Sequence, residues 1–157
     1  MMSEPSFSDQ DFGDLTYCAG WRGEVYLPVF EYKAELRITV LPRRSAPTDR
    51  QRDAYKAILN ALDLPLIQSF KEMARKLYLD RASRKKNVFS AVLPESPSKE
   101  DIWKTLREPA LFIPTQNSDR LEIAIIWKAT WDVEDGVLVY WRSDGTFSAL
   151  DFEDGGI

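Results

Sequence analysis

The first candidate for a catalytic or metal-binding site is the acidic segment at residues 132–136, DVEDG. Clustered carboxylates can hold calcium or magnesium, or share a proton in acid–base catalysis. The spacing does not match a calcium-binding helix–loop–helix segment: counting Asp132 as the first position places Ser143 at the twelfth, where a bidentate glutamate is required. An Asp-Gly pair is also typical of a hairpin turn, so a solvated turn flanked by acids is the alternative interpretation.

A second candidate is the basic stretch at residues 75–86, RKLYLDRASRKK, which holds six basic residues against Asp80 alone. It could follow a phosphate backbone, with Tyr78 offering a ring on which a base stacks. The whole chain, however, carries a net charge of −4, whereas nucleic-acid domains usually carry a basic excess. A helix end that runs into an exposed loop is therefore favoured over a nucleic-acid site.

The sequence contains no histidine and a single cysteine, Cys18. Ser-His-Asp and Cys-His catalytic sites cannot be built from this chain, and neither can a Cys/His zinc site or an intramolecular disulfide. Carboxylates, lysine, tyrosine or an oxygen-bound metal remain for catalysis. No enzyme motif occurs, so we expect neither a catalytic residue nor a cofactor or metal.

Four aromatic residues near the C-terminus form a third candidate site. Trp127 and Trp131 share one side of an alternating segment, which predicts that they lie in the core. Tyr140 and Trp141 are adjacent and must leave opposite faces of the next strand, so at least one of them is expected outside the core. An exposed aromatic side chain there could anchor a partner.

Composition predicts one cytoplasmic domain. The chain has 157 residues, of which 44% are hydrophobic, enough for a sizeable core. Apolar runs such as residues 124–127 are far too short to cross a bilayer. The polar, acidic N-terminus lacks the features of a secretory signal. We expect a disordered or extended acidic tail at residues 1–12 and a single domain at residues 13–157.

Hydrophobic periodicity predicts strands, then helices, then strands. Residues 15–40 alternate as an N-terminal antiparallel β-meander, and residues 121–157 as a C-terminal three-stranded meander with turns at Asp135-Gly136 and Asp144-Gly145. Two to three helices lie between them, the first opened by a capping box at residues 48–51. This order predicts an α+β domain with the helices packed on one face of the sheet. It leaves open whether the strands form one sheet or two, and the oligomeric state.

Two passages resemble an uncharacterised family of small bacterial cytosolic proteins. The first is residues 51–55, QRDAY, after a strand region that contains Trp21 and the LPVF of residues 27–30. The second is residues 127–139, where an aromatic strand runs into WDVEDG. The family often has histidine where this chain has Asp135. The family is similar to bacterial immunity proteins, which neutralise toxins by binding them, and this resemblance implies no catalytic residue.

Together these observations favour a non-enzymatic protein-binding module, in its most specific form an immunity-type protein with a basic partner such as a toxin. The acidic segment would steer a basic partner. The expected contact residues are Asp132, Glu134 and Asp135, with Tyr140 or Trp141 as the aromatic anchor. The alternatives are a carboxylate- or metal-dependent enzyme that adds Asp151, Glu153 or Asp154 to the acidic segment, and nucleic-acid binding through residues 75–86.

Overall fold

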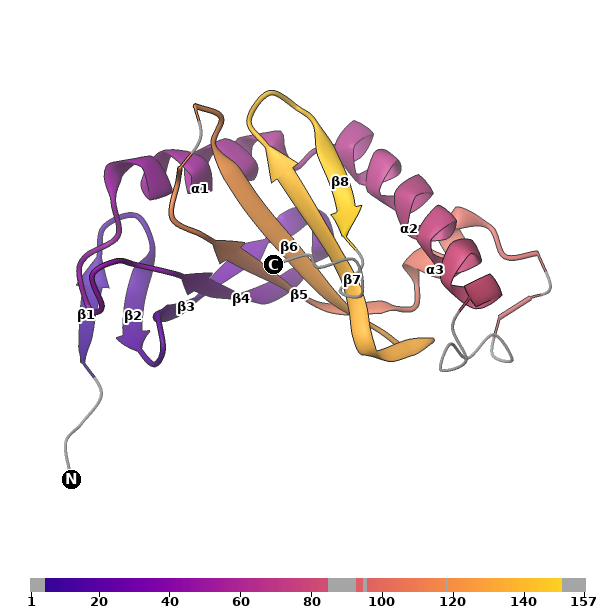
Figure 1. Ribbon diagram of the computed structural model, residues 1–157, viewed down its shortest axis with the longest axis horizontal. Helices are drawn as coiled ribbons and strands as arrows, with labels where there is room; N and C mark the ends of the chain where they lie inside the picture. Colours follow the sequence, from indigo (N-terminus) through magenta and orange to yellow (C-terminus); the bar gives the residue numbers. More distant parts are fainter. Residues whose placement is uncertain (1–4, 85–92, 95, 118, 151–157) are drawn as a thin grey trace.

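Eight strands form a single sheet in the computed structural model, which describes residues 5–84, 93–94, 96–117 and 119–150, with the backbone alone at 133, 134 and 150 (Figure 1). The strands lie side by side in the order of the sequence. Their bounds are β1 Ser6–Asp9, β2 Gly13–Tyr17, β3 Trp21–Leu27, β4 Tyr32–Ile38, β5 Leu106–Ile113, β6 Glu122–Ala129, β7 Asp132–Arg142 and β8 Phe147–Leu150.

The helices lie between β4 and β5 in the sequence: α1 Asp49–Ala61, α2 Leu64–Arg84 and α3 Lys99–Trp103. The predicted capping box opens α1, since the Thr48 hydroxyl accepts from the Gln51 N–H and the Gln51 side chain accepts from the Thr48 N–H. Ser98 and Asp101 cap α3 in the same way. No helix in the described part of the chain is long and apolar enough to cross a membrane.

A parallel pairing of β4 with β5 joins the two groups of strands into one sheet. The pairing runs from Glu35 opposite Ala110 to Ile38 opposite Ile113, and every other neighbouring pair is antiparallel. The α+β class is therefore confirmed, and the question of one sheet or two is answered. The sheet is larger than predicted, because β1 and a full-length β5 add to the two meanders.

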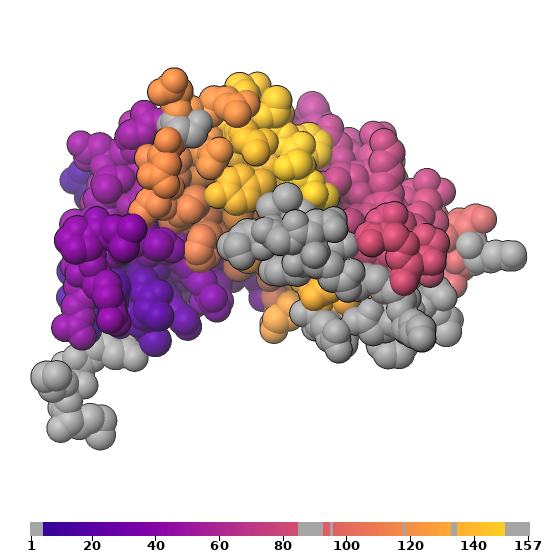
Figure 2. Space-filling view, in the orientation of Figure 1, coloured from indigo at the N-terminus to yellow at the C-terminus, as the bar shows by residue number. Residues whose placement is uncertain are grey.

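The helices cover one apolar face of the sheet, whereas the opposite face carries charged side chains together with apolar ones. Leu36, Leu111 and Ile125 point toward the helices and are fully buried, whereas Arg37 and Lys128 lie on the exposed side. On the covered face the rings of Phe70 in α2 and Trp127 in β6 meet edge to face with their centroids 6.0 Å apart. Space-filling Figure 2 shows the yellow C-terminal strands between the purple N-terminal part and the magenta α2.

Two local features of the N-terminal half differ in detail from the predicted arrangement. Residues 6–9 of the predicted tail form β1, which pairs with β2, and Phe12 is part of the hydrophobic core. Pro28 does not sit in a strand but begins a single 3₁₀ turn, Pro28–Phe30, where its missing N–H costs nothing.

The Asp135-Gly136 pair is not the predicted hairpin turn. The turn consists of Thr130 and Trp131, because Ala129 already pairs with Asp132. Asp135-Gly136 belongs to a bulge in β7, where Lys128 alone stands opposite residues 133–136. Gly136 has a φ of +65°, and an added Cβ would collide with the Trp127 carbonyl oxygen, so the glycine serves the bulge. The second predicted turn, at Asp144-Gly145, does connect β7 to β8.

We predict that Gln51→Ala destabilises the protein by about 2–3 kcal/mol. The buried Gln51 amide nitrogen donates to the Thr39 carbonyl at 2.5 Å and to the Pro114 carbonyl at 3.2 Å, so it ties the ends of β4 and β5 to α1. Urea denaturation measures the loss. The matched control is Gln68→Ala at an exposed position of α2. Equal stability of the two variants would contradict this role.

We also predict that Asp9 contributes stability that is lost in acid. The Asp9 carboxylate accepts hydrogen bonds from the Arg52 guanidinium at 2.6 and 2.7 Å and from the Phe12 N–H. These bonds hold the pKa of Asp9 below its usual range, and those from Arg52 have the largest effect. Because the folded pKa lies below the unfolded value of about 3.9, the contribution is complete above that value and is lost as the pH falls below it.

Asp9→Asn should therefore unfold more easily at pH 7, by about 1–3 kcal/mol. It should also lose less stability than the wild type as the pH is lowered from 5 toward 2. Asp53→Asn, at an exposed position of the same helix as Arg52, is the control that should behave as the wild type. Thermal unfolding across this pH range checks both expectations, and parallel curves for Asp9→Asn and the wild type would contradict them.

Candidate functional site

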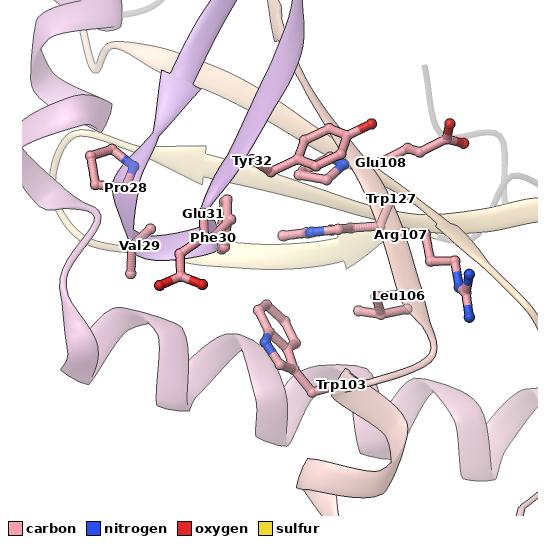
Figure 3. Close-up of a pocket in the computed structure, with 11 residues that line it drawn as sticks. Pro28, Val29, Phe30, Glu31, Tyr32, Trp103, Leu106, Arg107, Glu108 and Trp127 are labelled. Carbon is pink, nitrogen blue, oxygen red and sulfur yellow. The ribbon is translucent and has the colours of Figure 1, made fainter.

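A cavity of about 780 Å³ opens where the turn between β3 and β4 faces the end of α3 and the start of β5 (Figure 3). Aromatic and charged side chains together form its walls, a combination typical of binding sites. The lining residues are Pro28, Val29, Phe30, Glu31, Tyr32, Trp103, Leu106, Arg107, Glu108, Pro109 and Trp127.

Three rings from separate elements meet at this cavity and form its aromatic wall: Phe30, Trp103 and Trp127. The ring centroids of Trp103 and Trp127 are 5.6 Å apart, and Phe30 lies 5.9 Å from Trp127 and 6.1 Å from Trp103. Trp127 is buried, whereas Phe30 and Trp103 are half-buried. The inner part of the wall is therefore fixed by the core, and the outer part is open to a ligand.

Local structure places each ring of the aromatic wall. Phe30 ends the 3₁₀ turn, which closes through a hydrogen bond from the Glu31 N–H to the Pro28 carbonyl at 3.1 Å. Trp103 is the last residue of the capped helix α3, and the Lys71 ammonium lies 5.9 Å from the centre of its ring. The alternation of side chains along β6 directs Trp127 to the covered face of the sheet.

Two glutamates at the cavity have a left-handed backbone. The φ of Glu31 is 50° and that of Glu108 is 53°, values uncommon for residues other than glycine. Glu31 caps the 3₁₀ turn, and Glu108 lies where the register of β5 against β6 shifts between Arg107 and Ala110. Such conformations cost energy and gather at functional sites, which favours this cavity as one.

Of the charged side chains at the cavity, Glu108 forms an ion pair within the described residues, whereas Glu31 and Arg107 do not. Glu108 accepts from the Lys128 ammonium at 2.8 Å, and this contact raises the pKa of Lys128. Within the described residues, the side chains of Glu31 and Arg107 have neither an ion pair nor a hydrogen bond. Figure 3 shows the Glu31 carboxylate directed toward the side where Trp103 rises from α3, whereas Arg107 and Glu108 point away.

Tyr32 connects the cavity to the face of the sheet opposite the helices. A neighbouring hollow of about 290 Å³ shares Tyr32, Glu108 and Pro109 with the cavity and continues over Phe112 and Ile126. A third hollow, of about 690 Å³, also borders Tyr32 and extends over β2 and β3. The Tyr32 side chain, in a residue that is 36% exposed, thus stands at the junction of three concave surfaces.

Two residues expected at a partner surface are instead part of the interior. Asp132 is 0% and Trp141 3% exposed. Asp132 accepts from buried Arg81 at 3.1 Å, and Arg81 also donates to the Gly136 carbonyl and lies over the Trp131 ring. The prediction of surface contacts is wrong for these two residues, because the bulge in β7 turns Asp132 toward α2 and Trp141 shares the covered face with Val139.

Asp135 and Tyr140, two further expected contact residues, do not line the cavity. Asp135 and Tyr140 are half-buried, and burial raises the pKa of Tyr140. The Asp135 N–H donates to the Asp132 carboxylate at 3.3 Å. The side chain of Glu134 lies outside the described residues, as do Asp151, Glu153 and Asp154. The core positions predicted for Trp127 and Trp131 are confirmed.

The arginines described in residues 75–86 make intramolecular contacts. Arg75 donates to the Pro97 carbonyl at 2.8 Å, Arg81 is buried, and Arg84 pairs with Asp80 at 2.6 Å. Lys85 and Lys86 lie outside the described residues. No group of three or more acidic or cysteine side chains in the described part could hold a metal ion.

The residues of the cavity were not among the candidate site residues predicted from the sequence. The sequence predicts Phe30 at the end of a strand, Glu31 and Tyr32 at the turn that follows it, and Trp103 in a short helix. Two features of the sequence could have indicated a binding site: the aromatic residues on both sides of that turn, and the apolar Trp103 at the end of a helix. Nothing local indicates that these segments meet, since the contact depends on the pairing of β4 with β5.

A family model described as a domain of unknown function (DUF6985) matches residues 11–157. The match begins near the start of the predicted domain at residue 13. No curated protein and no solved structure matches the chain. The geometry of this chain must therefore carry the functional argument.

We predict that Asp132→Asn destabilises the protein by about 3–5 kcal/mol, because it leaves a buried guanidinium without its counter-charge. Among the described residues, Nε and Nη2 of Arg81 already have no hydrogen-bond partner. The double variant Arg81→Met/Asp132→Asn should regain part of the loss, and Asp80→Asn, in an exposed pair, should cost much less. Chemical denaturation of the four proteins checks this. A double variant less stable than Asp132→Asn would contradict it.

Proposed function

The chain belongs to the DUF6985 family, and we propose that it is a non-enzymatic protein-binding module whose binding surface is centred on Tyr32. The observation that carries the proposal is the position of Tyr32 where the aromatic cavity meets two further hollows. In protein interfaces a few central residues supply most of the binding energy, and tyrosine and tryptophan are enriched among them.

The arrangement of the carboxylates favours binding over catalysis. Acid–base catalysis by two carboxylates requires both to reach the same substrate. Glu31 points toward the cavity, but Glu108 points away and is paired with Lys128 (Figure 3). The aromatic wall then remains as the main feature that a ligand would contact.

The charge of the chain supports a basic partner. The net charge is −4, and an acidic protein attracts a basic one by long-range steering. The most specific form of the proposal is an immunity-type role, in which the chain neutralises a bacterial toxin by binding it. The resemblance described from the sequence supports this form.

The two other functions drawn from the sequence remain predictions. A carboxylate- or metal-dependent enzyme would need Asp132 at a surface, where it does not lie, or carboxylates outside the described residues. Nucleic-acid binding through residues 75–86 would depend on arginines that already have intramolecular partners.

We predict that Tyr32→Ser weakens partner binding at least tenfold, because it removes the aromatic side chain shared by the three hollows. Tyr26→Ser is the matched control: Tyr26 lies on the same hairpin and is 60% exposed, but it does not border the cavity. A tagged chain purified from its own organism identifies the partner, beginning with the product of the neighbouring gene. Calorimetry on the purified pair then gives the affinities.

A partner that binds the wild type and Tyr32→Ser equally would contradict the proposed surface. Recovery of no stoichiometric protein from the native organism, and no binding to the neighbouring gene product, would contradict the protein-binding function itself.

A further inference from the structure

We propose that the cavity receives an arginine side chain of the partner protein, with its guanidinium held between the Glu31 carboxylate and the aromatic wall. This inference rests on the proposed function and specifies the chemistry of the group that enters the cavity. Three observations support it: the packing of the rings, a Glu31 carboxylate with no partner among the described residues, and the directions of the other charges.

The aromatic wall is suited to a cation. Cations are attracted to the face of an indole ring when they lie within about 6 Å of its centre. The indoles of Trp103 and Trp127 meet edge to face at an interplanar angle of 62°. Trp127 is buried, so the half-buried ring of Trp103 is the indole that a ligand can reach. Trp103 already has one cation at this distance, the ammonium of Lys71 at 5.9 Å, which in turn pairs with Glu100 at 2.9 Å.

Glu31 supplies the counter-charge. Its carboxylate has no partner among the described residues, and Figure 3 shows it on the Trp103 side of the cavity. The left-handed backbone at Glu31 and the closed 3₁₀ turn before it fix the point from which the side chain leaves. A carboxylate in this position can accept two parallel hydrogen bonds from a guanidinium.

The other charged side chains of the cavity, Glu108 and Arg107, leave the space between Glu31 and the aromatic wall open for a cation of the partner. Glu108 is occupied by Lys128, so it does not compete for the ligand. Arg107 is the cavity's own arginine, but it is exposed and directed away from Glu31 (Figure 3). The negative charge that faces the aromatic wall is therefore not neutralised from within the described part of the chain.

Arginine fits these features better than lysine or an apolar side chain. A guanidinium is planar and weakly hydrated, so it can lie on an aromatic face and bind a carboxylate at the same time, whereas an ammonium is compact and strongly hydrated. An apolar side chain would desolvate Glu31 without giving it a partner, which is unfavourable. The cavity volume of about 780 Å³ is ample for any of these side chains. Charge and shape, and not size, therefore favour arginine.

The test compares two probes, N-acetyl-arginine methylamide and its neutral analogue N-acetyl-citrulline methylamide. Titrations follow the indole N–H signals of Trp103 and Trp127 by NMR. We expect saturable shifts with the arginine probe at a dissociation constant of roughly 1 mM, a binding free energy of about −4 kcal/mol. The citrulline probe should bind at least threefold more weakly. Equal binding of the two probes, or no binding of the arginine probe, would overturn the inference.

Variants connect the signal to the named residues. Glu31→Gln should weaken the arginine probe about three- to tenfold and leave the citrulline probe unchanged, and Trp103→Leu should abolish the binding of both. Glu24→Gln is the control: it lies on the same hairpin, pairs with Lys33 and does not border the cavity. Loss of binding in Glu24→Gln equal to that in Glu31→Gln would overturn the assignment to Glu31.

The two proposals can fail separately. If the arginine probe does not bind but the partner binds in a Tyr32-dependent manner, the arginine inference is overturned and the proposed function stands. If the probe binds selectively but no protein partner exists, the protein-binding function is overturned, and with it the assignment of the arginine to a partner protein.

Discussion

Four paired positions between β4 and β5, from Glu35 with Ala110 to Ile38 with Ile113, unite two strand meanders that are far apart in the sequence. Without this parallel pairing each group would be a small antiparallel sheet with an additional open edge. Parallel neighbours require a long crossover connection, and here the crossover contains all three helices. Gln51 stabilises the junction by donating to the carbonyls of Thr39 and Pro114, one at the end of each strand.

The aromatic cavity is a consequence of the same junction. Because β4 lies beside β5, the 3₁₀ turn before β4 faces the segment between α3 and β5, and Phe30 meets Trp103. The two glutamates with a left-handed backbone lie where these segments start or shift register. The inner, aromatic side of the cavity is thus part of the core, whereas its polar rim comes from the segments that connect the strands and helices.

Acidic side chains have two different roles in this protein. Asp132 and Asp9 are buried and pair with Arg81 and Arg52, so they stabilise the fold. Glu31 is exposed at a concave aromatic surface and has no such partner among the described residues. The distinction matters because Asp132, which belongs to the acidic segment, is buried in an ion pair, whereas Glu31, which lies at the cavity, is far from that segment in the sequence.

The sequence by itself determined the local structure: the capping box at Thr48, the alternation that buries Trp127, the Asp144-Gly145 turn and the α+β class. Each depends on neighbours a few residues away, whose hydrogen bonds and side-chain directions follow from spacing. Only the tertiary structure decided that β4 pairs with β5, that the segment at Asp135-Gly136 bulges rather than turns, and that Asp132 meets Arg81. These depend on which register buries the most apolar surface and gives buried charges a counter-charge, and that is a property of segments distant in the sequence. The cavity of Glu31, Tyr32 and Trp103 belongs to this second group, because its walls become neighbours only when the sheet is complete.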